Sequence, residues 1–207
     1  MGHMTICPSP SIPEVHPALA ARFSPVVFDP DAEVCDEQVD TLLDAARRAP
    51  SAGNSQPWMF IVARRGDAVH RRIVPHLARS SSMWAPNASL LVINCSHVLV
   101  EGTTDWEYSE FARYDLGQAV AHMTVQGLHL GLAAHQFRAF DRDALAVEFH
   151  VPAHIEVTTM TAFGIPGDRR GEATSPGTSR DRASIENITW ARDESMRRGP
   201  VHRDPPR

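Results

Sequence analysis

RRAPSAGNSQPW, residues 47–58, follows a stretch with helical periodicity and leads into the apolar run MFIVA. A plain connection from a helix to a strand needs only a glycine or an asparagine, yet this turn holds Pro50 and Pro57 with small and amide residues between them. Prolines hold the backbone rigid, and small residues leave open space above it. The turn is therefore suited to present the Asn54 amide to a flat ring. A proline-rich helix stop in which Asn54 bonds its own backbone is the simpler alternative.

The elements on either side of this turn mix along one chain. Apolar residues spaced by three and four positions predict a helix over about 36–48, with Asp36 as its N-cap. The same patterns predict further helices over about 67–78, 109–130 and 141–148, and strands at 58–64, 88–94, 133–137 and 155–163. The helix over 109–130 is apolar on nearly every side and is expected to run through the middle of the fold. An α+β or α/β domain with helices covering a small sheet follows.

Length, charge and cysteine usage exclude several classes of protein. A chain of 207 residues suits one domain, and a net charge of −5 argues against non-specific binding of nucleic acid. No apolar run approaches the roughly 18–20 residues that span a bilayer, and the N-terminus lacks a secretory pattern. An odd count of three distant cysteines suits a reducing compartment, so we expect a cytoplasmic protein. The three cysteines are Cys7, Cys35 and Cys95.

The domain organisation predicted from composition has three parts: an irregular, proline-rich arm over 1–17, the folded domain over 18–190, and a disordered tail over 191–207.

Two kinds of catalytic site find no support in the sequence. His122, His129 and His135 lack cysteine or carboxylate neighbours at ligand spacing, so no metal site is expected. A serine nucleophile at Ser51 or Ser55 is also not expected, because the chain has no GxSxG turn.

Cationic residues near both ends of the predicted domain suggest an anion site. Arg22 and Ser24 lie in ARFSPVVFDP, residues 21–30, and Arg180 and Arg182 lie in TSRDRASIENI. Three guanidinium groups and a hydroxyl suit a phosphate monoester, because guanidinium forks match phosphate oxygens. Asn54 offers both a donor and an acceptor to the edge of a ring. Taken singly, each arginine is more often a solvated surface charge.

Together, these pieces resemble the nitroreductase family of FMN-dependent oxidoreductases. The resemblance rests on the Arg-x-Ser segment, APSAGNSQPW, the YDLGQAV helix that ends in HLGLAA, GIP after the last strand, and the closing arginine pair. It covers about residues 18–190. It implies a three-layer α/β/α fold with a central, mostly antiparallel sheet and a long buried central helix. It also implies an intertwined homodimer with two FMN molecules at the subunit interface.

The resemblance also implies roles for single residues. Arg22, Phe23, Ser24, Arg180 and Arg182 would hold the phosphate and ribityl end of FMN. The turn residues Pro50, Ser51, Ala52 and Asn54 would contact the isoalloxazine from the partner subunit, braced by Gln56, Pro57 and Trp58. The backbone N–H of Ala139, beside Arg138, would meet flavin N5, and no side chain would act as a catalytic acid or base. Trp106 and Tyr114 are candidates to line the substrate pocket.

The implied activity is a ping-pong cycle in which NADH or NADPH delivers hydride to flavin N5 and a second substrate then takes it. That substrate could be a nitroaromatic, a quinone or a natural-product intermediate that is dehydrogenated. Two departures from the family pattern, Val26 where many relatives carry a basic residue and Arg138 where some carry an acidic one, keep a flavin-sequestering protein with little turnover open. An interaction module without flavin is the third alternative.

Overall fold

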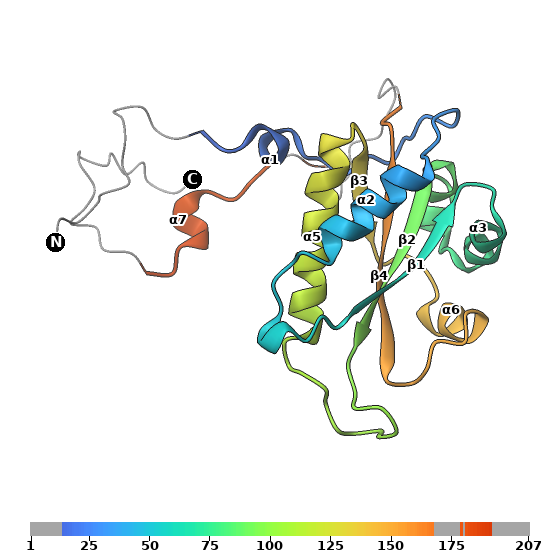
Figure 1. The fold of residues 1–207 in the computed structure, drawn as a ribbon. Helices are drawn as coiled ribbons and strands as arrows, with labels where there is room; N and C mark the ends of the chain where they lie inside the picture. Colours follow the sequence, from blue (N-terminus) through green and yellow to red (C-terminus); the bar gives the residue numbers. More distant parts are fainter. Residues whose placement is uncertain (1–13, 168–178, 180, 192–207) are drawn as a thin grey trace.

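The computed structural model describes residues 14–167, 179 and 181–191, and its centre is a four-stranded antiparallel sheet (Figure 1). The spatial order is β1-β2-β4-β3, so β2 and β4 lie inside and β1 and β3 form the edges. The strands are β1 (Trp58–Arg64), β2 (Leu90–His97), β3 (Ala133–Phe137) and β4 (Ile155–Gly164). The predicted mixture of helices with a small antiparallel sheet is confirmed.

Helices cover both faces of the sheet and make three layers (Figure 1). On one face, α2 (Asp36–Ala46) and α5 (Ala112–His129) bury Leu42, Leu116 and Met123 against β2 and β4. On the other face, α3 (Ala68–Ile73) and α6 (Arg142–Glu148) bury Ile73 and Leu145. Each face therefore has its own apolar core, and the sheet separates the two.

The structure corrects the expected burial of two elements. β1 is an edge strand rather than a fully buried one, and Met59 on it is 51% exposed. The helix expected in the middle of the fold, α5, is buried on one side only. Its buried side carries Leu116, Ala119 and Met123, while Tyr114 and Val125 face outward. Apolar side chains therefore remain exposed on the outer side of α5 in the single chain.

The ends of several elements differ from the predictions; β2, for example, spans Leu90–His97 rather than 88–94, and two other differences have a clear local cause. The N-cap of α2 is Cys35, one residue before the expected Asp36, and Gln38 completes the cap by accepting from the Cys35 N–H at 3.0 Å. The helix expected over 67–78 is broken at Pro75, which has no N–H to continue it. In its place stand α3, a 3₁₀ turn η2 (Val74–His76) and α4 (Arg79–Ser82).

Two short helices project from the three layers. α1 (Pro17–Ala21) lies at the end of α5 where α5 finishes, and α7 (Ile185–Ile188) stands away from the sheet (Figure 1). Within the described part of the chain, no helix is both long and apolar enough to cross a membrane. The predicted arm over 1–17 and tail over 191–207 fall almost entirely outside the described residues, so those domain boundaries stay predictions.

Candidate functional site

The turn after α2 holds an unusual backbone. Gly53, Asn54 and Gln56 all have positive φ angles, of 58°, 57° and 49°. Glycine adopts this region freely and asparagine tolerates it, whereas most side chains do not. Pro57 then fixes the entry to β1, and its carbonyl accepts from the N–H of His97 at 2.8 Å. The residue choice at 53 and 54 thus follows from the shape of the turn, and Asn54 is left exposed at its tip.

Ser51 ties the turn to itself from within. Its carbonyl accepts from the Asn54 N–H at 3.0 Å, and its hydroxyl accepts from the Gln56 N–H at 3.0 Å. The side chain of Gln56 donates to the Asn54 carbonyl at 3.4 Å, which agrees with the bracing role predicted for it. These three bonds hold the turn in a compact shape from within.

Asp115 holds the turn from outside. This carboxylate is 2% exposed, and its Oδ2 accepts from the backbone N–H of Ala52 at 3.0 Å. Its Oδ1 accepts from the side chain of Gln118 at 3.4 Å. A buried charge is costly unless hydrogen bonds satisfy it, and here it anchors the turn to the first turn of α5. The sequence alone did not indicate this role of Asp115.

A ring stack supports the turn from a second direction. Tyr108 stacks on His97 with ring centroids 3.9 Å apart, and its hydroxyl lies 3.5 Å from the Ser55 carbonyl. His97 is the last residue of β2, so this stack joins the turn to the sheet. Trp58, at the start of β1, is buried in the core beneath the turn, as its bracing role predicts.

The segment that carries Arg22 lies beside the edge strand β3. The guanidinium of Arg22 donates to the hydroxyl of Ser24 at 3.3 Å. The carbonyl of Pro25 lies 2.8 Å from Nδ1 of His135 on β3, and the His135 ring stacks on Trp84 at 4.5 Å. Burial lowers the pKa of His135, and the positive charge of Arg22 lowers it further. The predicted pair of Arg22 and Ser24 is therefore brought together, next to a neutral imidazole.

The same segment is fixed to the sheet through the GIPG stretch after β4. The N–H of Asp29 donates to the Ile165 carbonyl at 2.9 Å, and the N–H of Gly167 donates to the Val27 carbonyl at 3.0 Å. Gly164 permits this approach, because a Cβ there would lie 2.9 Å from the ring of Phe28. The GIP motif thus sets the position of the N-terminal segment rather than touching a ligand by itself.

Ala139 follows β3 in a tightly held strand exit. Its carbonyl accepts from the Ala78 N–H at 3.0 Å, and the Phe140 N–H donates to the Arg138 carbonyl at 3.0 Å. No acceptor for the Ala139 N–H occurs among the residues that the structure describes. A half-buried donor without a protein acceptor fits the predicted role of Ala139 toward a ligand. The side chain of Arg138 is exposed beside it.

The turn and the Arg22 segment occupy opposite ends of α5 (Figure 1). Ala52 is bonded to Asp115 near the start of this helix. Leu19, shortly before Arg22, lines a groove with Val125 and Gln126, about 15 Å further along the helix axis at 1.5 Å per residue. A single chain therefore does not bring Asn54 to Arg22.

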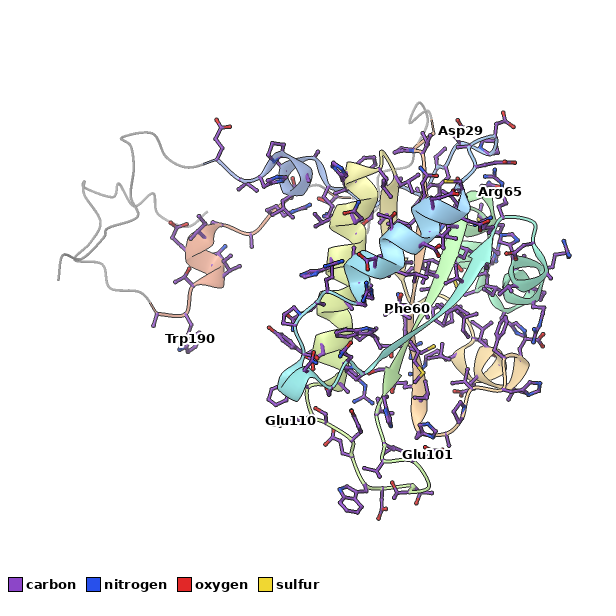
Figure 2. The ribbon with its side chains drawn as sticks, in the orientation of Figure 1. Asp29, Phe60, Arg65, Glu101, Glu110 and Trp190 are labelled. Atoms are coloured by element: carbon purple, nitrogen blue, oxygen red, sulfur yellow. The ribbon has the colours of Figure 1, made fainter. Side chains whose placement is uncertain are left out.

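The remaining predicted site residues are the two C-terminal arginines and the two candidates for the substrate pocket. Arg180 lies outside the described residues. Arg182 is exposed, and its guanidinium donates to the neighbouring Asp181 carbonyl at 2.8 Å. Trp106 and Tyr114 are 68% and 67% exposed, so neither lines a pocket within one chain. Figure 2 shows side chains projecting from the loop around Glu101 below the sheet.

Metal ligands are not assembled in the described part of the chain: no group of three or more histidine, cysteine, aspartate or glutamate side chains is placed to hold an ion. His122 and His129 lie exposed on α5, and His135 is engaged with Pro25 and Trp84.

Known proteins share this fold. The family model described as Nitroreductase family matches residues 19–91, which contain both the Arg22 segment and the turn. A solved structure described as an oxidoreductase containing FMN superposes with a TM-score of 0.77 and 26% identity, over 87% of this chain and 92% of that one. The chain belongs to the nitroreductase family.

Two curated relatives extend the comparison. A protein of Archaeoglobus fulgidus with the provisional name NADH dehydrogenase/NAD(P)H nitroreductase is 27% identical over 144 residues, covering 68% of this chain and 79% of the relative. The major NAD(P)H-flavin oxidoreductase of Aliivibrio fischeri is 34% identical over 82 residues, covering 40% of this chain and 35% of the relative. For this nitroreductase-family chain, the site described above is therefore the one to test for cofactor binding.

Proposed function

We propose that this nitroreductase-family protein is an FMN-dependent oxidoreductase that uses NADH or NADPH to reduce a second small molecule. The support comes from relatives named NAD(P)H nitroreductase and NAD(P)H-flavin oxidoreductase and from the FMN-containing structure with the same fold. The single observation that carries the proposal is the Arg22–Ser24 pair beside β3, followed along that strand by the Ala139 N–H.

The residues present fit FMN in their chemistry. The guanidinium of Arg22 bonds a hydroxyl rather than a carboxylate, so its charge is available to a phosphate. Phe23 and Ser24 would flank the ribityl end, and the Ala139 N–H would face the ring. Arg180 and Arg182 would add charge to the same phosphate.

The second half of the site would come from a partner subunit. Pro50, Ser51, Ala52 and Asn54 lie at the far end of α5 from Arg22, so one chain would offer the phosphate site and its partner the ring wall. The outward side of α5, with Phe111, Tyr114 and Val125 exposed, offers an apolar surface for a homodimer. In that assembly Trp106 and Tyr114 could reach the partner's pocket.

The chain's part in the reaction would be binding, orientation and exclusion of water. FMN would supply the hydride chemistry when bound, with NAD(P)H as the hydride donor and the second substrate as the acceptor. The Ala139 N–H would orient the ring, Asp115 would keep the turn in place through Ala52, and the neutral His135 would hold the Pro25 carbonyl. None of these groups has to transfer a proton.

A direct experiment is to purify the protein and record its visible spectrum with and without added FMN. A yellow protein that is bleached without oxygen by NADH or NADPH supports the oxidoreductase, and reoxidation by quinones, nitroaromatics or oxygen then sorts the substrate class. A yellow protein that neither nucleotide bleaches favours flavin sequestration, the alternative that the apolar Val26 near the phosphate end keeps open. A colourless protein that does not take up FMN rejects both.

A further inference from the structure

Ser81 on α4 holds the carbonyl of the residue that we expect to face flavin N5. Its hydroxyl oxygen lies 2.5 Å from the Ala139 carbonyl oxygen and 3.0 Å from the Ala78 carbonyl oxygen. A hydroxyl has one proton. At the shorter distance two oxygens without a proton between them would repel, so the proton points to Ala139. Ser81 is 1% exposed and comes from 58 positions earlier in the chain.

The Ala139 carbonyl therefore has two donors from one helix start. The N–H of Ala78, which caps α4, is the other donor, at 3.0 Å. The Phe140 N–H, in the same peptide unit as the Ala139 carbonyl, donates to the Arg138 carbonyl, and the Asp141 N–H donates to the His76 carbonyl at 2.9 Å. The Arg138 carbonyl belongs to the peptide unit that carries the Ala139 N–H, so both peptide units at Ala139 are held, while the Ala139 N–H itself is left for a ligand.

We propose that Ser81 is a positioning residue for the cofactor: it fixes the Ala139–Phe140 peptide, whose N–H holds the Arg138 carbonyl, and so sets the direction of the Ala139 N–H toward the flavin ring. The inference rests on the proposed FMN site. A backbone donor stabilises a ligand best when its direction is fixed before the ligand arrives. The loop after β3 has no proline, so its backbone could rotate unless other groups held it.

Two substitutions remove the two donors separately. Ser81→Ala deletes the hydroxyl with the loss of one atom. Ala78→Pro deletes the N–H at a residue whose φ of −67° proline can adopt, after Leu77, which is extended with ψ 137°, but the proline ring also pushes the Ala139 carbonyl away. Ser82→Ala is the matched control, because the Ser82 hydroxyl is exposed and bonds only the Arg79 carbonyl of its own helix, at 3.1 Å.

The measurements are the FMN dissociation constant by fluorescence, the visible spectrum and midpoint potential of the bound flavin, and amide exchange of Ala139 and Phe140 in the protein without FMN. Loss of one hydrogen bond of about 1 kcal/mol predicts about fivefold weaker FMN binding for Ser81→Ala, and Ala78→Pro, which also displaces the Ala139 carbonyl, should weaken FMN binding at least as much. We also expect an altered flavin spectrum and potential, with faster exchange at Phe140. Ser82→Ala should match the wild type in each.

The inference is overturned if both variants bind FMN as tightly as Ser82→Ala with the same spectrum and potential, even when their melting temperatures fall. In that case Ser81 is only structural. If Ser81→Ala does not fold, Ala78→Pro decides alone. Wild-type protein that binds no FMN refutes the proposed function instead, and the exchange measurement still tells whether Ser81 holds the Ala139 peptide.

Discussion

The carboxylate of Asp115 on α5 accepts the backbone N–H of Ala52 at 3.0 Å, across 63 positions of sequence. The bond joins the start of α5 to the turn that carries Asn54. Asp115 is buried and Ala52 is half-buried, so loss of the carboxylate removes a charge-assisted bond and leaves the Ala52 amide without this acceptor. The position of the turn therefore depends on one side chain of a distant helix.

Replacement of Asp115 by alanine should destabilise the protein by about 1.5–3 kcal/mol, the range for hydrogen bonds to charged groups. Urea unfolding measures this. Asp115→Asn keeps an acceptor oxygen and should lose less. Asp40→Ala, at an exposed position of α2, is the control and should change little. Equal effects of Asp115→Ala and Asp40→Ala would remove the anchoring role.

Asn54 allows the backbone and the side chain to be tested apart. Its φ of 57° strains alanine by about 1–2 kcal/mol but leaves glycine relaxed. Asn54→Gly should therefore keep the stability of the wild type, and Asn54→Ala should lower it. If the amide touches the flavin, both variants change FMN affinity or potential alike. Normal flavin properties in Asn54→Gly would confine Asn54 to a turn-forming role.

Arg22→Ala should weaken FMN retention by about 1.5–3 kcal/mol, because it removes a charged donor from the phosphate end. Equilibrium titration with FMN checks the value, and raised salt should narrow the difference. Arg72→Ala is a suitable control: Arg72 pairs with Glu148 at 2.7 Å on the α3–α6 side. An unchanged dissociation constant in Arg22→Ala would place the phosphate elsewhere.

Stability should fall in mild acid through His135. Burial and the neighbouring Arg22 lower its pKa in the folded protein, while the unfolded chain titrates near about 6.5. The unfolded state then binds more protons, so this contribution is complete above about pH 6.5 and is lost as pH falls through the folded pKa. Unfolding free energies from about pH 7.5 to 5 should show a shallower slope in His135→Gln.

In His135→Gln, the dependence of the unfolding free energy on pH should become weaker but should not disappear, because burial also lowers the pKa of His70. His129→Gln, at the exposed end of α5, is the control and should keep the wild-type slope. A His135→Gln profile parallel to the wild type would mean that the imidazole is as easily protonated in the folded chain as in water.

Val125 tests the proposed dimer. It is exposed on α5, and a glutamate there would place a charge in the subunit interface. Light scattering should give twice the single-chain mass of 22.8 kDa for the wild type and a shift toward one chain for Val125→Glu. Val147→Glu, at an exposed valine of α6, should stay dimeric. A Val125→Glu dimer as tight as the wild type would move the interface to another face.

Local sequence patterns predicted those features of the fold that neighbouring residues determine, namely the strands and the mixed class of the fold. β1 and β3 have the predicted bounds, because apolar and β-branched runs are closed by Pro57 and Gly131 on one side of each. The break at Pro75 was readable from the missing N–H but was not predicted. The mixed fold followed from the alternation of these elements.

The supports of the site were not predictable in this way. Asp115 and Ser81 act on residues 63 and 58 positions away, and no local pattern specifies such a pairing. One signal was present for Asp115: a carboxylate on the side of α5 that carries Leu116 and Ala119 must have a buried partner. No sequence signal pointed to Ser81, because serine is common in short helices.

The separation of Arg22 and Asn54 along α5 has a genetic consequence. If each cofactor takes its phosphate contacts from one chain and its ring wall from the other, lesions at the two positions complement. Consider a mixed dimer of one chain that lacks Arg22 and one chain that lacks Asn54. One of its two cofactor sites then lacks both residues, and the other site has both. Two inactive alleles expressed together would then restore half of the sites in every mixed dimer.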